Sequence, residues 1–460
     1  TNLVDHKIII QIPSVFPTPN MTQQGYDGIG SNNTSGTTPW PIINPNIYWH
    51  IEAQYREVGT STMSWQPFIN GIGPCGGAYS YCPGDTYYNF DFANPSTIYS
   101  IGLDAKKKIE RAKQDIIDAL NIPSTHKIVF TSGGTEANNL FIKGLCFPDK
   151  KVAYLGLEHP SILEPLAYLG SLGNNPLSLL EYQTEGRLDL KQASVLSKSQ
   201  SRFLCLSHVN NELGTVNDPV SVFEALHANS PGTRLFMDGV QAVGSLKLSS
   251  KVWSGLAGYS LSAHKIHGPK GIGLLIYDSK LAITPIIHGG QQQDGVRSGT
   301  LPVPLIRSMA RAIVRAVERI DEMQDHLSYL NNRLVQGLCE LNDQLPSLNS
   351  RFNSLVIDDL KRQSPSIVNF SFLPVEGEVL LHHLEEKNIF VGLGSACSAS
   401  LKKPSKILTG IGLSGEEARC SLRVSFSGNN TVEDVDLFVK EFSRVYQDLY
   451  PTFQEKYSTN

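Results

Sequence analysis

The segment from Lys127 to Glu136 constrains the fold of this chain more than any other part of its sequence. A mainly apolar run at residues 127–130 is followed by the polar turn 131–135, which contains two glycines, and then by a helical pattern that starts near Glu136. This order predicts a buried strand, a tight turn and a helix. Backbone N–H groups at such a helix start lie at the positive end of the helix dipole and favour an anion. An ordinary tight turn is the alternative interpretation.

The same alternation recurs along the middle of the chain. Apolar runs at residues 151–157, 202–207 and 234–237 are each followed by polar residues and then by a helical or loop stretch. Strands that alternate with helices in this way usually form a mainly parallel sheet with helices on its faces. The sequence therefore predicts an α/β fold with a mostly parallel central sheet.

The two ends of the chain differ from this middle part. A helix is expected over residues 105–120, where apolar residues recur at helical spacing. A long helical pattern from Pro304 to about Gln344 precedes further alternation, which indicates a smaller α/β domain. Residues 13–90 are crowded with Pro, Gly, Asn, Ser and Thr and show no sustained period. The predicted domains are an irregular N-terminal extension (1–90), a large domain (91–303) and a small C-terminal domain (304–460).

Composition narrows the class of ligand. With 40% hydrophobic residues, the 460-residue chain can bury a sizeable core, and its length favours at least two domains. A net charge of -4 gives no general attraction to nucleic acid or anionic membranes, so a small metabolite is the expected ligand. No apolar run approaches the roughly 20 residues that a membrane helix needs. We therefore expect a soluble protein of the cytoplasm, or of an organelle matrix if an upstream targeting segment was removed.

The seven cysteines are scattered, and their odd number favours free thiols in a reducing compartment over a disulfide framework. Cys397 lies among the small residues of segment 392–400, which predicts a mobile loop with an unhindered thiol; a buried structural cysteine is the alternative. Cys75 and Cys82 could pair or bind a metal, although two loop thiols are the simpler interpretation.

Asp238 and Lys265 are two further candidate site residues, because each lies in a local sequence that is typical of a catalytic or cofactor-binding position. Asp238 follows an apolar run, which places a carboxylate at the carboxyl end of a buried strand, where α/β sheets form their sites. Such a carboxylate could hold the protonated pyridine nitrogen of pyridoxal phosphate (PLP), whereas a helix cap is the alternative. Lys265 lies in a glycine-rich turn beside Ser262 and His264. A lysine nucleophile that forms a Schiff base needs such surroundings to hold it and lower its pKa, although a surface lysine is the alternative.

Together these segments resemble the cysteine desulfurases, PLP enzymes of fold type I. The likeness runs from about Phe92 to Phe438, and the motifs occur in the family's order. The matching segments are residues 130–139, 158–159, 208–214, 238–241, 262–271, 297–300, 375–378, 392–400 and 421–423. The family's usual opening segment, of the type Asp-Asn-Ala-Ala-Thr-Thr-Pro, has no copy here, so the role of the first 90 residues is left open.

The resemblance implies a role for each matching residue. Lys265 would hold the PLP cofactor and move substrate protons, Asp238 would keep the ring nitrogen protonated, and His159 would stack on the ring and could shuttle a proton. Cys397 would attack the substrate sulfur as a thiolate. The remaining residues are implied to bind the cofactor or the substrate: Gly134, Thr135, Ser262 and His264 at the phosphate, Gln241 at the ring oxygen, Asn211 and Arg423 at the substrate carboxylate with Asn211 also near the cofactor, and Thr300 at the phosphate of the neighbouring subunit.

The implied reaction converts L-cysteine to L-alanine and leaves a persulfide on Cys397. The sulfur would pass to an acceptor protein, for iron–sulfur cluster or thio-cofactor synthesis, and the enzyme would be a homodimer. A selenocysteine lyase or a PLP aminotransferase of the same fold is the first alternative. A cofactor-free structural relative is the second, although the presence of Lys265 and Asp238 argues against it.

Overall fold

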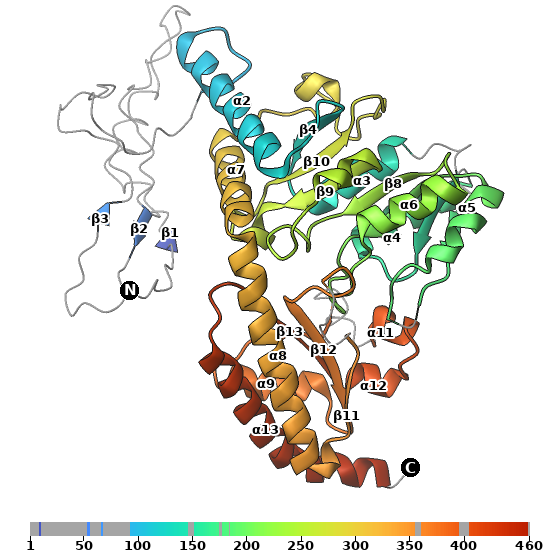
Figure 1. Ribbon diagram of the computed structural model, residues 1–460. Helices are drawn as coiled ribbons and strands as arrows, with labels where there is room; N and C mark the ends of the chain where they lie inside the picture. Colours follow the sequence, from blue (N-terminus) through green and yellow to red (C-terminus); the bar gives the residue numbers. More distant parts are fainter. Residues whose placement is uncertain are drawn as a thin grey trace, which may run out of the picture. The chain divides into compact units, whose positions relative to one another are not determined.

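The computed structural model describes residues 93–145, 151–173, 177–183, 185–354, 360–394 and 404–458, together with three short strands near the N-terminus (Figure 1). The chain divides into two units, Thr1–Phe90 and Asp91–Asn460. In the first unit, β1 (Ile9–Ile10), β2 (Ala53–Tyr55) and β3 (Gln66–Pro67) form an antiparallel sheet with β2 in the middle. Cys75 and Cys82 lie outside the described residues.

The second unit is organised around a sheet of seven strands in the order β4-β10-β9-β8-β7-β5-β6. Their bounds are β4 (His126–Thr131), β5 (Lys151–Leu155), β6 (Leu177–Leu180), β7 (Ser201–Ser207), β8 (Arg234–Asp238), β9 (Leu256–Ser262) and β10 (Gly273–Asp278). Only β10 runs antiparallel to its neighbours, β4 and β9, and the other pairs are parallel. The predicted mostly parallel α/β sheet is therefore confirmed.

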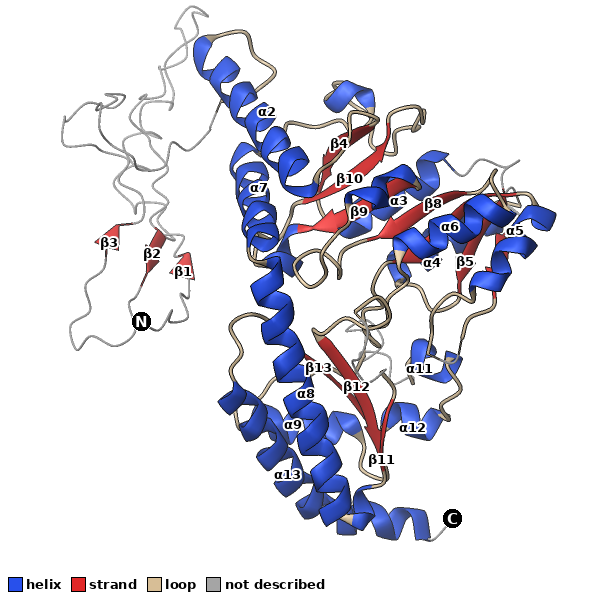
Figure 2. Cartoon of the chain, viewed as in Figure 1, coloured by secondary structure: helices blue, strands red, loops and turns tan. Residues whose placement is uncertain are grey.

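Alternate residues of the strands enter two separate hydrophobic cores. In β7, Leu204 and Leu206 belong to one core, whereas Phe203 and Cys205 belong to the other. The first core also contains residues of α2 (Ser100–Leu120), α5 (Ala193–Ser199), α6 (Pro219–Asn229) and α7 (Val303–Glu318). The second contains residues of α3 (Gly134–Leu145) and α4 (Pro160–Ser171). Helices thus cover both faces, which explains why the strands are continuous apolar runs (Figure 2).

A smaller antiparallel sheet follows, in the order β11-β12-β13. Its strands are β11 (Ser350–Phe352), β12 (Ile367–Phe372) and β13 (Ser421–Ser425), and the helices of this region are α8 (Ile320–Gln344), α9 (Gly377–Glu385), α11 (Lys406–Gly410), α12 (Gly415–Arg419) and α13 (Val432–Ser458). Phe370, Phe372 and Phe442 form part of one buried cluster between this sheet and its helices. This is the smaller α/β part that the sequence predicts. The domain boundary at 303/304 stays a prediction.

Two details differ from the expected helices. The helix expected over residues 105–120 begins earlier, at Ser100. The long helical pattern from Pro304 to Gln344 is divided into α7 and α8 at Arg319, whose backbone angles (φ -106°, ψ 13°) interrupt the helix. Both helices keep their apolar residues buried on either side of the break, so periodicity alone gives no signal of it. Within the described part of the chain, no helix is long and apolar enough to cross a membrane.

Candidate active site

Three predicted site residues come together at the carboxyl edge of the large sheet. Asp238 ends β8 and is buried, and Lys265 follows the end of the neighbouring strand β9 in a short 3-10 turn (Ala263–Ile266). His159 is the N-cap residue of α4, just beyond the end of β5. The charges of Asp238 and Lys265 both act on the pKa of His159, which is lowered by burial, raised in part by Asp238 and lowered further by Lys265.

Lys265 has the environment expected of a lysine nucleophile. The side chain is reachable from solvent, yet partial desolvation lowers its pKa, and the charge of Arg423 lowers it further while Asp238 opposes both. A lowered pKa raises the fraction of unprotonated amine, the form that can act as nucleophile or base. Arg423 lies on β13 of the smaller part, and its hydrogen bond to the backbone oxygen of Asn211 (2.9 Å) joins that strand to the loop after β7 of the large sheet.

The glycine turn between β4 and α3 lies against the Lys265 turn. A Cβ atom on Gly134 would stand 2.6 Å from Val240 Cγ2, so only glycine fits there without movement. A Cβ atom on Gly133 would lie 3.8 Å from Ser262 Oγ, and Ser262 Oγ is itself 2.9 Å from His264 Nδ1. Thr135, in the first turn of α3, is exposed. Four of the residues predicted to bind phosphate (Gly134, Thr135, Ser262 and His264) therefore surround one helix N-terminus, as an anion site requires.

The Arg423 guanidinium group is hydrogen-bonded through Nη1 to residues of two loops. Its Nη1 donates hydrogen bonds to the backbone oxygens of Asn211 (2.9 Å) and Gly394 (2.8 Å). Its Nε is buried, and among the described residues it has no hydrogen-bond partner. Nε and Nη2 form the edge of a guanidinium that binds a carboxylate with two parallel hydrogen bonds. The structure thus places Arg423 beside the backbone of Asn211, and their role at the substrate carboxylate stays a prediction.

Two predicted residues lie in turns or loops. Gln241 lies in the turn after Asp238 and is half-buried, and Thr300 is exposed in the loop that precedes α7. Cys397 lies outside the described residues; the described chain stops at Gly394 and resumes at Pro404. Among the described residues, no cluster of three or more His, Cys, Asp or Glu side chains could hold a metal ion.

The structure adds residues that the sequence analysis did not single out. Asn138 is fully buried, and its Nδ2 donates to Asp238 Oδ2 (2.7 Å) and to Ser161 Oγ (2.8 Å). A signal for Asn138 exists, because it lies four residues after Gly134 and therefore on the same face of the helix. No sequence signal links Asn138 to Ser161, since their contact depends on how α3 and α4 pack.

Glu158 is a second buried carboxyl near Asp238. Burial raises its pKa to about 8, hydrogen bonds from the Ser207 backbone and hydroxyl oppose this rise, and the charge of Asp238 adds to it. Burial, with a contribution from Asp238, also raises the pKa of Tyr259. Both groups are therefore mainly neutral near pH 7.

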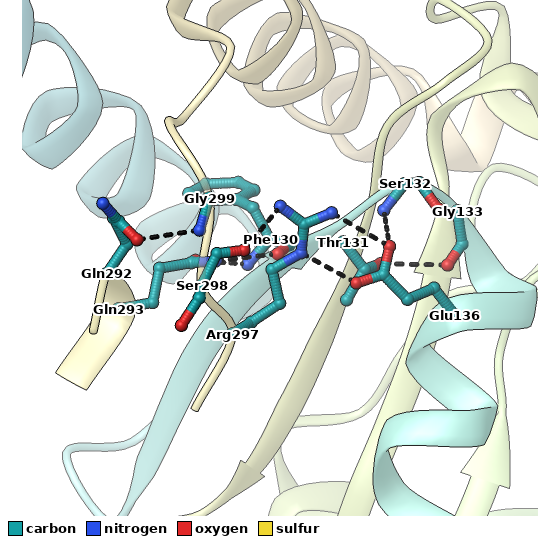
Figure 3. Close-up of polar contacts among 10 residues, drawn as sticks. All are labelled: Phe130, Thr131, Ser132, Gly133, Glu136, Gln292, Gln293, Arg297, Ser298 and Gly299. Atoms are coloured by element: carbon teal, nitrogen blue, oxygen red, sulfur yellow. Dashed lines mark hydrogen bonds and ion pairs between the residues drawn. The ribbon is translucent and has the colours of Figure 1, made fainter. Parts of the chain in front are cut away.

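Figure 3 shows how the loop that precedes Thr300 is fixed to the glycine turn. Arg297 Nε and Nη2 donate to the two carboxylate oxygens of Glu136 (2.8 and 3.2 Å), and Ser132 N donates to Glu136 Oε2 (2.7 Å). Arg297 Nη1 also donates to Ser298 O (3.3 Å). Burial alone raises the pKa of Glu136, but the hydrogen bonds of Arg297 and Ser132 and the Arg297 charge lower it on balance.

Replacing Arg297 with methionine is expected to lower the free energy of unfolding by about 3 kcal/mol near pH 7, because a mostly buried Glu136 carboxylate loses its partner. Since the folded-state pKa of Glu136 is lowered, the ion pair stabilises the fold above the ordinary glutamate pKa. That stabilisation is lost as the pH falls through the lowered pKa, so the deficit should shrink in acid. Denaturant unfolding across a pH series measures it.

The matched control is Lys127→Met, which removes the exposed ion pair with Asp294 (3.4 Å). Exposed pairs contribute at most about 1 kcal/mol, so this variant should unfold nearly as the unmodified protein does. Equal, small losses in both variants would contradict a stabilising role for the Arg297–Glu136 pair.

The chain is similar to known proteins over most of its length. A family model described as aminotransferase class-V matches residues 84–438. A cysteine desulfurase IscS of Clostridium botulinum is 32% identical over 384 residues, covering 80% of this chain and 94% of the relative. A cysteine desulfurase IscS of Klebsiella pneumoniae is 35% identical over 353 residues, and the match covers 75% of this chain and 83% of the relative. A solved NifS-like protein has a TM-score of 0.70 at 27% identity, covering 78% of this chain and 93% of the other. A structure described as SspA in complex with cysteine has a TM-score of 0.59 at 29% identity, and the match covers 73% of this chain and 91% of the other.

Proposed function

Because this chain belongs to the aminotransferase class-V family, and within it to the cysteine desulfurases, we propose that it binds PLP and converts L-cysteine to L-alanine, with Cys397 taking up the sulfur. The observation that carries this proposal is the juxtaposition of Lys265, whose pKa is lowered, with the buried carboxylate of Asp238 at the carboxyl ends of neighbouring strands. The cysteine in the SspA structure supports the choice of substrate.

The residues present fit PLP. The cradle around Gly134, where a side chain would meet Val240, suits a phosphate group and would be completed by Thr135, Ser262 and His264. Asp238 suits the protonated ring nitrogen, and Gln241 and Asn211 would contact the ring's other polar atoms. When bound, PLP supplies an electron sink that stabilises negative charge at the substrate α-carbon.

In the proposed reaction, Lys265 would transfer protons and Cys397 would act as the nucleophile. The lowered pKa of Lys265 leaves its Nζ able to take a proton from the substrate α-carbon and to return protons to the product. The Cys397 thiolate would attack the substrate sulfur, so that an S–S bond forms as the C–S bond breaks. The products are alanine and a persulfide on Cys397.

A direct assay tests the proposal against its alternatives. The cofactor-loaded protein, incubated with L-cysteine and a thiol reductant, should release alanine and sulfide in equal amounts. Formation of a keto acid without sulfide would favour an aminotransferase. Turnover of selenocysteine but not of cysteine would favour a selenocysteine lyase, and a colourless protein that takes up no PLP would favour a cofactor-free relative.

The proposed contact of Arg423 with the substrate carboxylate predicts how substrate binding depends on this residue. Replacing Arg423 with lysine keeps the charge but removes the two-pronged geometry, which is worth about 1.5–3 kcal/mol for a charged hydrogen-bonded pair. The KM for cysteine should therefore rise about 10- to 100-fold, with a smaller change in kcat. Arg419→Lys, an exposed substitution on α12, is the matched control. An unchanged KM in Arg423→Lys would contradict the assignment.

We further propose a homodimer in which Thr300 reaches the phosphate site of the partner subunit. Thr300 is exposed, and the segment just before it is held in place by Arg297 and by the hydrogen bond from Gly299 N to Gln292 Oε1 (2.8 Å). Light scattering should give twice the mass of the chain, and a fully active monomer would contradict this arrangement. The sulfur would pass to an acceptor protein for iron–sulfur cluster or thio-cofactor synthesis.

A further inference from the structure

Two buried polar side chains, Ser161 and Asn138, connect the two predicted ring contacts, His159 and Asp238, in one chain of hydrogen bonds. His159 Nδ1 is 2.7 Å from Ser161 Oγ, which is 2.8 Å from Asn138 Nδ2, which is 2.7 Å from Asp238 Oδ2. The backbone N–H of Ser161 also donates to His159 Nδ1 (3.1 Å). Ser161, Asn138 and Asp238 are 6%, 0% and 7% exposed, so water does not replace these bonds. These hydrogen bonds join the start of α4, the first turns of α3 and the end of β8.

The direction of each hydrogen bond follows from groups that can only donate. A backbone N–H can only donate, so His159 Nδ1 must accept and carries no proton. The Ser161 hydroxyl lies against the same nitrogen and must therefore donate to it as well. Asn138 Nδ2, which also can only donate, supplies one N–H to Ser161 Oγ and the other to Asp238.

The orientation of the Asn138 amide is fixed by charge. Its Oδ1 is buried and has no hydrogen-bond partner among the described residues. The reversed amide would place this oxygen 2.7 Å from the Asp238 carboxylate, where two acceptors would repel each other. Asn138 Oδ1 therefore stays without a hydrogen bond because both N–H groups of the same amide are directed at Asp238 and Ser161.

We propose that Asn138 and Ser161 are positioning residues that hold His159 as the neutral tautomer with its proton on Nε2. Adding a proton to Nδ1 would break the hydrogen bond from the Ser161 backbone N–H and set the new N–H against that fixed donor, while the Ser161 hydroxyl would have to turn from donor to acceptor. His159 would then take part as a stacking ring and a hydrogen-bond donor at Nε2, and the movement of substrate protons would fall to Lys265. A neutral imidazole that donates a hydrogen bond is a known catalytic device.

The charges around His159 are consistent with this assignment. Burial lowers its pKa, Asp238 at the end of β8 raises it, and Lys265 in the turn after β9 lowers it, with a net lowering. Glu158, the preceding residue, is itself neutral near pH 7 because burial raises its pKa to about 8. Asp238 is therefore the group that favours an imidazolium, and its Oδ2 is occupied by Asn138.

Nitrogen-15 NMR of histidine-labelled protein tests the proposal, with His159→Gln used to assign the signal. In both the cofactor-free and the PLP-loaded protein, Nδ1 should be unprotonated and Nε2 protonated from about pH 6 to 9, across the range in which an ordinary histidine titrates. A proton on Nδ1, or an imidazolium with an ordinary pKa, would overturn the proposal. Because the cofactor-free protein gives the result, it is independent of whether the desulfurase reaction is confirmed.

Variants of Ser161 separate positioning from folding. Ser161→Ala removes one of the two donors, so the imidazolium should appear about one pH unit higher than in the unmodified protein, as expected for the loss of one hydrogen bond. Ser161→Thr keeps the hydroxyl and should restore the original titration. Ser171→Ala, at the exposed end of the same helix, is the matched control. No shift in Ser161→Ala, or an equal shift in Ser161→Thr, would overturn the role of the hydroxyl.

Discussion

Replacing Cys397 with serine is expected to abolish sulfide release while PLP binding and cysteine binding persist. The residues proposed to bind the cofactor and the substrate carboxylate include Asp238, Lys265 and Arg423, and they are held by contacts within the described part of the chain. Sulfur transfer does require the thiol, because a serine hydroxyl is far less nucleophilic than a thiolate near neutral pH. Turnover should fall at least about a thousandfold, although addition of cysteine should still change the visible spectrum.

Cys339→Ser is the matched control for this variant. Cys339 is a free, exposed thiol on α8 and should be replaceable without loss of turnover. The buried thiols Cys205 and Cys420 are less suitable, because their replacement also disturbs packed cores. Wild-type turnover in Cys397→Ser would contradict the proposed sulfur acceptor even if the protein still bound PLP.

The strands that the sequence predicted each contain an apolar run that is followed by polar residues. The middle residues of β7 and β8 are apolar and buried because helices cover both faces of these strands. β9 was not predicted, although all of its residues are buried. Gly258 and Ser260 interrupt its apolar pattern, and a Cβ atom on Gly258 would stand only 2.6 Å from Phe141. Its burial is thus a property of tertiary packing.

The candidate site shows the same division between local and tertiary information. Asp238 could be predicted because it directly follows an apolar run, and sites of α/β sheets lie at the carboxyl ends of strands. Lys265 could be predicted from its glycine-rich turn beside Ser262 and His264, although the strand before it was not predicted. Ser161 could not be predicted as a partner of Asn138, since 23 residues separate them and only the packing of α3 against α4 joins them. The tautomer of His159 likewise depends on bonds that no sequence pattern records.

Replacing Lys265 with alanine is expected to remove the visible absorption of the lysine-bound cofactor and to lower turnover by at least about ten thousandfold, since nucleophile and proton carrier are lost together. Lys270→Ala, in the exposed part of the same turn, should keep both properties. Absorption spectra and alanine release measure the two effects. An unchanged absorption band in Lys265→Ala would contradict the assignment of this residue.

Lys265→Arg separates the charge of this residue from its chemistry. Arginine preserves a positive charge near Asp238, but it stays protonated in proteins and cannot act as the amine nucleophile. If Lys265 served only to balance the carboxylate, the arginine variant would retain most of the turnover. If its lowered pKa is what matters, as burial and the neighbouring Arg423 charge indicate, the arginine variant should be as inactive as the alanine variant. The comparison of the two variants thus tests directly whether the unprotonated amine is the functional form.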